Sequence, residues 1–155
     1  MATAEIGLEG LDTIESESLC LFVPQDERPL SGAPGFADWR LNGGLSRRLL
    51  EGFFTGAFKE LMLLPSSGLL PSKRVFAVGV GPLKQLDAQR LGELLELAAG
   101  TLKKAGAESV ALSLPPVGLD DATRAALVRD HFLPTFGHRG VTVLAERGLK
   151  AALAG

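Results

Sequence analysis

The sequence predicts an α/β protein with a central mixed sheet of about six strands, mostly parallel, flanked by helices. Two observations support this prediction. From residue 74 onward the order is strand, helix, strand, helix, strand, helix, which is typical of parallel strands joined by helical crossovers. The strand expected at residues 74–80 is apolar on both faces, as in a central strand covered by helices on both sides.

The first half of the chain is expected to add two or three strands and one helix. Residues 5–23 should contribute strands, above all the apolar run at 18–23, which ends at Pro24 because proline has no amide to donate to a sheet. Residues 25–35 contain two prolines and two glycines and should form a loop. Asp38 is expected to cap a helix within residues 42–52. A strand at 58–64 and a hairpin-like connection at 65–72 complete this half.

The second half holds the most regular pattern. Residues 87–104 repeat leucine and alanine at the spacing of one helical face, with Asp87 as the predicted N-cap and Gly106 as the stop. Asp120 or Asp121 should begin a later helix. The remaining elements expected here are a strand at 109–114, a helix at 120–132, a strand at 140–144 and a closing helix at 146–154.

Composition restricts the class of protein. The 155 residues, 46% of them hydrophobic, are expected to form a single domain over residues 1–155. A formal charge of −2 disfavours nucleic-acid binding, and a single cysteine excludes a disulfide framework. The first ten residues lack the basic start and apolar stretch of a signal peptide, and no apolar run is long enough for a membrane span. We therefore expect a cytoplasmic protein that does not bind membranes.

One short segment is a candidate ligand site. Asn42, Gly43 and Gly44 form a glycine-rich turn that opens a helix, and backbone amides at such a turn can hold a phosphate group. Arg47 and Arg48 lie close by in the sequence and would add positive charge. The alternative is that the two glycines only relieve crowding where the helix begins.

The other motifs do not form a complete catalytic site. Gly79 and Gly81 follow a strand, but the third glycine of a dinucleotide fingerprint is absent, so we expect a plain strand-to-helix turn. His131 and His138 are not at a metal-binding spacing and are expected at the surface or at helix ends. Cys20 lies in an apolar strand and should be a buried, inert thiol. No catalytic residue, metal site or cofactor is predicted.

Several features, in this order along the chain, resemble the N-terminal domain of the leucyl (cytosol) aminopeptidase family. Asp38, Leu41, Gly44 and Leu45 resemble one pattern of that domain, and residues 75–81 resemble its central strand. A second pattern, Phe-x-Gly-Lys-x-Gly-Glu, is similar to the segment that ends at Glu60. Within that segment Phe54, Gly56 and Glu60 fit, whereas Ala57 and Lys59 replace the usual lysine and glycine.

This resemblance implies a three-layer, macro-domain-like fold that carries no catalytic residues. In that family the peptidase chemistry belongs to a larger C-terminal domain with two divalent metals, whose Asn-Thr-Asp-Ala-Glu-Gly-Arg signature is absent here. We therefore expect a stand-alone, non-catalytic binding or assembly module. Its partners would be itself, as the related domain contributes to hexameric assemblies, or a separate aminopeptidase catalytic chain. The alternatives are a module that binds ADP-ribose or a nucleotide phosphate, and, against the acidic balance, a DNA-binding protein.

Overall fold

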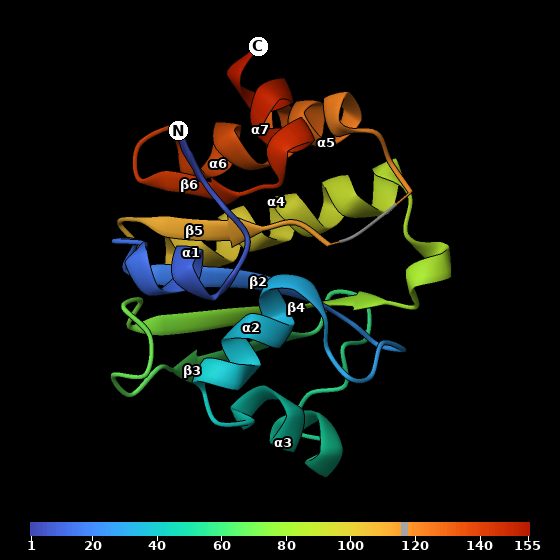
Figure 1. Ribbon diagram of the computed structural model, residues 1–155. Helices are drawn as coiled ribbons and strands as arrows, with labels where there is room; N and C mark the ends of the chain where they lie inside the picture. Colours follow the sequence, from blue (N-terminus) through green and yellow to red (C-terminus); the bar gives the residue numbers. More distant parts are fainter. Residues whose placement is uncertain (116–117) are drawn as a thin grey trace.

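A computed structural model describes residues 1–115 and 118–155 and contains one six-stranded sheet (Figure 1). The strand order is β1-β6-β5-β2-β4-β3. Every neighbouring pair is parallel except β3 and β4, which are antiparallel. The predicted mixed, mostly parallel sheet of about six strands is therefore confirmed. The strands are β1 (Ala2–Ala4), β2 (Ser18–Pro24), β3 (Leu61–Pro65), β4 (Arg74–Gly81), β5 (Val110–Ser113) and β6 (Val141–Leu144).

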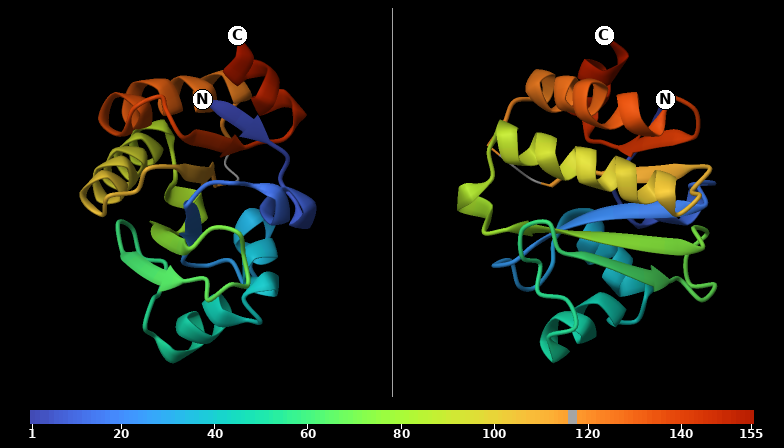
Figure 2. Two further views of the ribbon diagram at one scale, coloured as in Figure 1. Left: turned by 90° about the vertical axis from the view of Figure 1, so that its left-hand side faces the viewer. Right: turned by 180° about the vertical axis from the view of Figure 1, so that it is seen from behind.

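Helices cover both faces of the sheet, which gives the three layers (Figure 2). One face packs against α1, α2 and α3, and the other packs against α4 and the helices that follow it. Side chains alternate between these two cores along β2, because successive residues of a strand point to opposite faces. The helices are α1 (Leu8–Thr13), α2 (Gly32–Arg40), α3 (Gly44–Glu51), η1 (Leu83–Gln85), α4 (Ala88–Lys104), α5 (Asp121–Leu127), η2 (Val128–Phe132), α6 (Leu133–Phe136) and α7 (Arg147–Ala154).

Most of the predicted elements are present, including both predicted helix caps with aspartate. Asp87 accepts a hydrogen bond from the Arg90 amide at 2.8 Å and begins α4. Asp120 accepts one from the Thr123 amide at 2.7 Å and begins α5. Hydrogen bonding with Thr123 lowers the pKa of Asp120 below its ordinary value. The hairpin-like connection predicted at residues 65–72 joins the antiparallel pair β3 and β4.

Two helices in the first half were not predicted. Residues 5–23 were expected to be strands, but Leu8–Thr13 forms α1, a short helix that buries only Leu11. Residues 25–35 were expected to be a loop, but α2 begins at Gly32. Pro34 lies in the first turn of α2, where a helix tolerates proline because those amides have no partner within the helix.

Smaller differences concern element boundaries. The strand predicted at 58–64 begins at Leu61, because Lys59 adopts a positive φ of 68°. The helix predicted at 120–132 widens into a π-helical stretch at Val128–Phe132 and continues into α6. No helix in the described part of the chain is long and apolar enough to cross a membrane.

Candidate functional site

The glycine-rich turn predicted from the sequence forms the corner between α2 and α3. Asn42 and Gly43 adopt left-handed backbone conformations, with φ of 55° and 79°, and the helix starts at Gly44 rather than at Asn42. The Gly43 amide donates to the Asp38 carbonyl oxygen at 2.9 Å, and the Arg47 guanidinium donates to the Asn42 carbonyl oxygen at 2.6 Å. The chain therefore reverses sharply here, which explains the glycine at position 43.

A carboxylate of the protein itself holds the first free amides of α3. Oδ1 of Asp38 accepts hydrogen bonds from the backbone amides of Leu45 at 2.9 Å and Ser46 at 3.0 Å, and Oδ2 accepts from the Ser46 hydroxyl. Asp38 thus caps this helix as predicted, although it lies within α2. A phosphate group at these two amides would have to displace Asp38.

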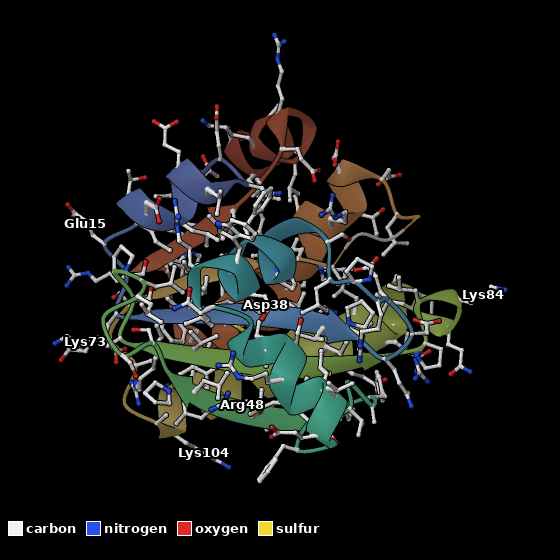
Figure 3. All side chains as sticks on the ribbon, turned by 60° about the horizontal axis from the view of Figure 1, so that its bottom comes forward. Glu15, Asp38, Arg48, Lys73, Lys84 and Lys104 are labelled. Carbon is white, nitrogen blue, oxygen red and sulfur yellow. The ribbon has the colours of Figure 1, made fainter. Side chains whose placement is uncertain are left out.

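The four predicted ligand-binding residues are divided between two pockets. Asn42 and Gly43 line a surface pocket of about 570 Å³ between α2 and α3. Gly44 and Arg47 line a smaller pocket of about 140 Å³ between α3 and the hairpin that joins β3 to β4. Figure 3 looks onto this end of the molecule, with Asp38 above the start of α3 and Arg48 beside it.

Trp39 is an exposed aromatic residue that sequence reasoning did not single out. Its side chain on α2 is 71% exposed, and it lines both the 570 Å³ pocket and a neighbouring pocket of about 370 Å³. Leu30 and Phe36 also line this second pocket. Exposed tryptophan is enriched at protein interfaces because its large ring buries much apolar surface at a low cost in side-chain entropy. An aromatic residue between two polar neighbours, Asp38 and Arg40, was the available signal.

More apolar side chains are exposed at the end of the molecule formed by α3 and β3. Leu50 is 89% exposed and Phe53 is 80% exposed, because α3 turns Leu45 toward the sheet and its opposite face toward solvent. Leu61 and Leu63 are also exposed, on the face of the edge strand β3 that shares its side with Phe76. We call Leu50, Phe53, Leu61 and Leu63 the β3-end patch. Leu61 and Leu63 pair with Val78 and Phe76 of the α4-side core, whereas α3 packs on the other side of the sheet, so the patch includes side chains from both sides of the edge strand. Large exposed apolar side chains of this kind are typical of interaction sites.

The segment that resembles the second aminopeptidase pattern has a structural role. Oε1 of Glu60 accepts hydrogen bonds from the amides of Thr55 and Gly56, which closes the segment into a loop. Gly56 has a φ of 81° and packs against the carbonyl of Pro24 at the end of β2. A Cβ added at Gly79 would lie only 1.9 Å from the Ala57 carbonyl oxygen. The loop therefore covers the carboxyl ends of β2 and β4, and glycine at position 79 permits that contact.

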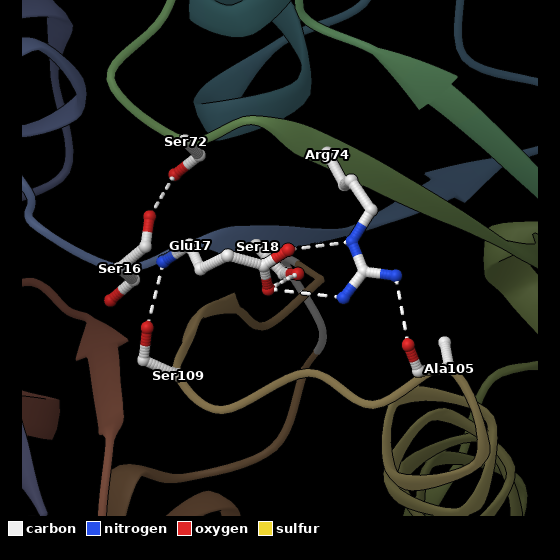
Figure 4. Close-up of polar contacts among 7 residues, drawn as sticks. All are labelled: Ser16, Glu17, Ser18, Ser72, Arg74, Ala105 and Ser109. Carbon is white, nitrogen blue, oxygen red and sulfur yellow. Dashed lines mark hydrogen bonds and ion pairs between the residues drawn. The ribbon is translucent and has the colours of Figure 1, made fainter.

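A polar cluster joins β2 and β4 at their amino ends (Figure 4). The Arg74 guanidinium donates to both carboxylate oxygens of Glu17, at 2.6 Å and 3.1 Å, and to the Ala105 carbonyl oxygen at 2.9 Å. The Ser109 hydroxyl accepts from the Glu17 amide, and the Ser18 hydroxyl donates to the Glu17 carboxylate. The hydrogen bond from Arg74 first, and then the one from Ser18, hold the pKa of the Glu17 carboxylate below its ordinary value. Because each group is engaged within the protein, the cluster is structural.

The remaining candidates do not come together as a catalytic site. Cys20 is fully buried, and burial raises the pKa of its thiol to about 12, which agrees with the predicted inert role. Nδ1 of His131 lies 2.6 Å from the Glu96 carboxylate, whereas His138 lines a pocket beside β6. Within residues 1–115 and 118–155, no group of three or more potential ligands could hold a metal ion.

Solved structures with the same fold include aminopeptidases and macrodomains. A mutant of tomato leucine aminopeptidase matches 99% of this chain and 35% of its own, with a TM-score of 0.65 and 16% identity. The macrodomain of Mycobacterium tuberculosis DarG matches 94% of this chain and 98% of its own, with a TM-score of 0.69 and 15% identity. These similarities establish the macro-domain-like fold.

Sequence comparisons identify the family. Residues 20–130 match the model of the cytosol aminopeptidase family, N-terminal domain. A probable cytosol aminopeptidase of Streptomyces griseus is 30% identical over 130 residues, which cover 81% of this chain and 25% of that protein. One of Geotalea uraniireducens is 36% identical over 69 residues, which cover 44% of this chain and 14% of that protein. The chain thus spans a quarter or less of these curated relatives. It belongs to the cytosol aminopeptidase family, of which it represents the N-terminal domain.

Proposed function

We propose that residues 1–155 form a single, non-catalytic domain that assembles with a second copy of itself through the β3-end patch. The observation that supports this most directly is the exposure of Leu50 and Phe53, which no described part of the chain covers. A second copy is the chosen occupant because the related domain contributes to hexameric assemblies of aminopeptidases. The names of the curated relatives also favour action in the cytoplasm.

The patch is suited to pairing with a copy of itself. Leu50 lies near the end of α3, Phe53 follows that helix, and Leu61 begins the edge strand β3, so all three belong to the β3 side of the molecule. Both chain termini lie at the other end, near β6 (Figure 1). A two-fold axis on the β3 side would bury the same apolar side chains on both copies.

The oligomeric state tests this proposal. We expect analytical ultracentrifugation of the wild type to give a concentration-dependent mass above that of the monomer. Leu50→Lys should make the protein monomeric, because it places a charge in the apolar contact. The matched control is Ala151→Lys, which adds the same charge at an exposed position of α7 and should behave as the wild type.

Two outcomes would contradict self-assembly. The first is a wild type that stays monomeric up to near-millimolar concentration. The second is a Leu50→Lys variant with the wild-type mass. A wild type that is monomeric alone but forms a heavier complex with an aminopeptidase catalytic chain would transfer the assembly role to that partner.

The non-catalytic role has its own test. We expect no hydrolysis of leucyl-p-nitroanilide with added Mn²⁺ or Zn²⁺, because a two-metal hydrolase needs several carboxylates close together to hold the ions. The described residues provide no such group. Hydrolysis that chelator abolishes would overturn this part of the proposal.

A second candidate function is the binding of ADP-ribose or a related nucleotide. It is favoured by the sheet topology, since the connections leaving β2 and β5 run in opposite directions and ligands of open α/β sheets bind at such a point. A macrodomain of Oceanobacillus iheyensis with this fold was solved with ADP, at a TM-score of 0.65 and 14% identity. The absence of heat in a calorimetric titration with millimolar ADP-ribose would exclude this function.

A further inference from the structure

The small pocket between α3 and the β3–β4 hairpin gathers positive charge. Arg47 and Arg48 both line it. Their guanidinium groups converge over Gly44: the position of a Cβ there would be 3.7 Å from Nη1 of Arg48 and 3.9 Å from Nη2 of Arg47. These two nitrogens are therefore less than 8 Å apart. Two cations this close repel each other unless a negative group lies between them.

No carboxylate of the described chain neutralises these two arginines. Five other cationic side chains (Arg40, Lys59, Arg74, Arg124 and His131) lie within ion-pair distance of a carboxylate, but neither Arg47 nor Arg48 does so within residues 1–115 and 118–155. Each guanidinium donates one hydrogen bond to a backbone carbonyl near the start of α3: Arg47 donates to Asn42, and Arg48 donates to Gly44. The remaining N–H groups of both guanidinium forks are left for a ligand.

The opposite wall of the pocket supplies hydroxyl groups. Ser66 is only 2% exposed, and its backbone is used in the hairpin, where its amide donates to Lys73 and its carbonyl accepts from Leu69. Its side chain lines the pocket together with Arg47 and Arg48. Ser67, with a φ of 54°, brings a second, exposed side chain to the same wall.

We propose that this pocket binds the phosphate group of a small ligand. Guanidinium forks donate pairs of hydrogen bonds to phosphate oxygens, and a phosphate dianion would remove the repulsion between the two arginines. The volume of about 140 Å³ suits a single phosphate group rather than a whole nucleotide. This site is separate from the Leu45 and Ser46 amides that Asp38 occupies. It includes Pro65, which pairs with Arg74 at the amino end of β4, whereas the nucleotide site considered above would lie at the carboxyl ends of β2 and β5.

Calorimetric titration with inorganic phosphate at low ionic strength tests the proposal. We expect binding by the wild type and at least fivefold weaker binding by Arg48→Gln and by Arg47→Gln. Ser66→Ala should weaken it as well, because the hydroxyl is a pocket donor. The control Arg139→Gln removes the same charge from an exposed position beside β6 and should bind phosphate as the wild type does.

The location is tested by nuclear magnetic resonance. We expect phosphate to shift the amide signals of Gly44, Ser66 and Ser67 most. The proposal is overturned by a wild type that gives no heat with phosphate, or by an Arg139→Gln variant that loses as much affinity as Arg48→Gln. It is also overturned if the largest amide shifts occur in residues 25–31, the loop that follows β2. The assembly proposal is judged separately, by the mass of the protein without phosphate.

Discussion

The polar cluster at the amino ends of β2 and β4 leads to a quantitative prediction. Replacing Arg74 with methionine keeps most of the aliphatic stem and removes three hydrogen bonds, two to Glu17 and one to the Ala105 carbonyl. These bonds connect three separate segments: the start of β2, the start of β4 and the end of α4. The variant Arg74→Met should therefore lower the free energy of unfolding without changing the fold.

The size of the loss follows from burial. A buried hydrogen bond to a charged group contributes about 1.5–3 kcal/mol, whereas an exposed ion pair contributes about 0–1 kcal/mol. The side chains of Arg74 and Glu17 are 27% and 30% exposed, so this pair lies between those limits. A further hydrogen bond, to the Ala105 carbonyl, is also lost, so we expect Arg74→Met to cost about 2–3 kcal/mol in all. Glu17→Gln should cost less, and the double variant should cost less than the two losses added together, because both remove the same contact.

The dependence on pH adds an independent check. Because the pKa of Glu17 is lower in the folded protein than in the unfolded chain, its contribution is fully present above the ordinary value near 4.5. It is lost as the pH falls through the lowered, folded-state value. The difference in stability between the wild type and Arg74→Met should therefore shrink in acid.

Urea unfolding followed by circular dichroism measures these differences. Far-ultraviolet dichroism is preferable to fluorescence, because the single tryptophan, Trp39, is already largely exposed in the folded state. A loss below about 0.5 kcal/mol at neutral pH, within the usual range for surface substitutions, would refute the structural role of the cluster. A difference that stays constant from neutral pH into acid would refute the assignment to Glu17.

Three further predictions concern the packing of the sheet and its helices. Gly79→Ala should destabilise the protein by about 3 kcal/mol or more, because the new Cβ would overlap the Ala57 carbonyl. The control is Gly100→Ala in α4, where the added Cβ meets open space. In the same thermal scan this control should raise the melting temperature. Cys20 should react with a thiol reagent only in denaturant, because burial raises its pKa to about 12, and rapid reaction of the native protein would contradict this. Arg129→Ala should speed amide hydrogen exchange in α7, because Nη2 of this residue donates to three carbonyls at the end of that helix, and unchanged exchange would remove that role.

The sequence was informative wherever local pattern and burial agree. Arg74–Gly81 is apolar on both faces and lies inside the sheet, between β2 and β3, and Ala88–Lys104 repeats leucine on one face. The prediction failed where short segments depend on tertiary contacts. The six residues of α1 bury only Leu11, and α2 carries Gly32, Pro34 and Gly35, so neither has a strong local pattern. Their helical form is stabilised by packing on the sheet and on each other.

The candidate site shows the same division. Local spacing identified Asn42, Gly43, Gly44 and Arg47 as a turn that begins a helix, and it correctly named Asp38 as the cap. Only the folded chain brings Ser66 and Arg48 into the same pocket. The hydrophobic pattern of the sequence does not predict how the residues between α3 and the hairpin run in space.

The amino-acid order by itself determined the layers of this domain, since the alternation of apolar strands and amphipathic helices leaves few ways to bury both faces of a sheet. The tertiary structure decided which polar groups are satisfied and which apolar side chains stay uncovered. Hydrogen bonds and exposure depend on distances between residues far apart in the chain. That is why the capped amides of α3, the paired arginines and the uncovered Leu50 became visible only in three dimensions.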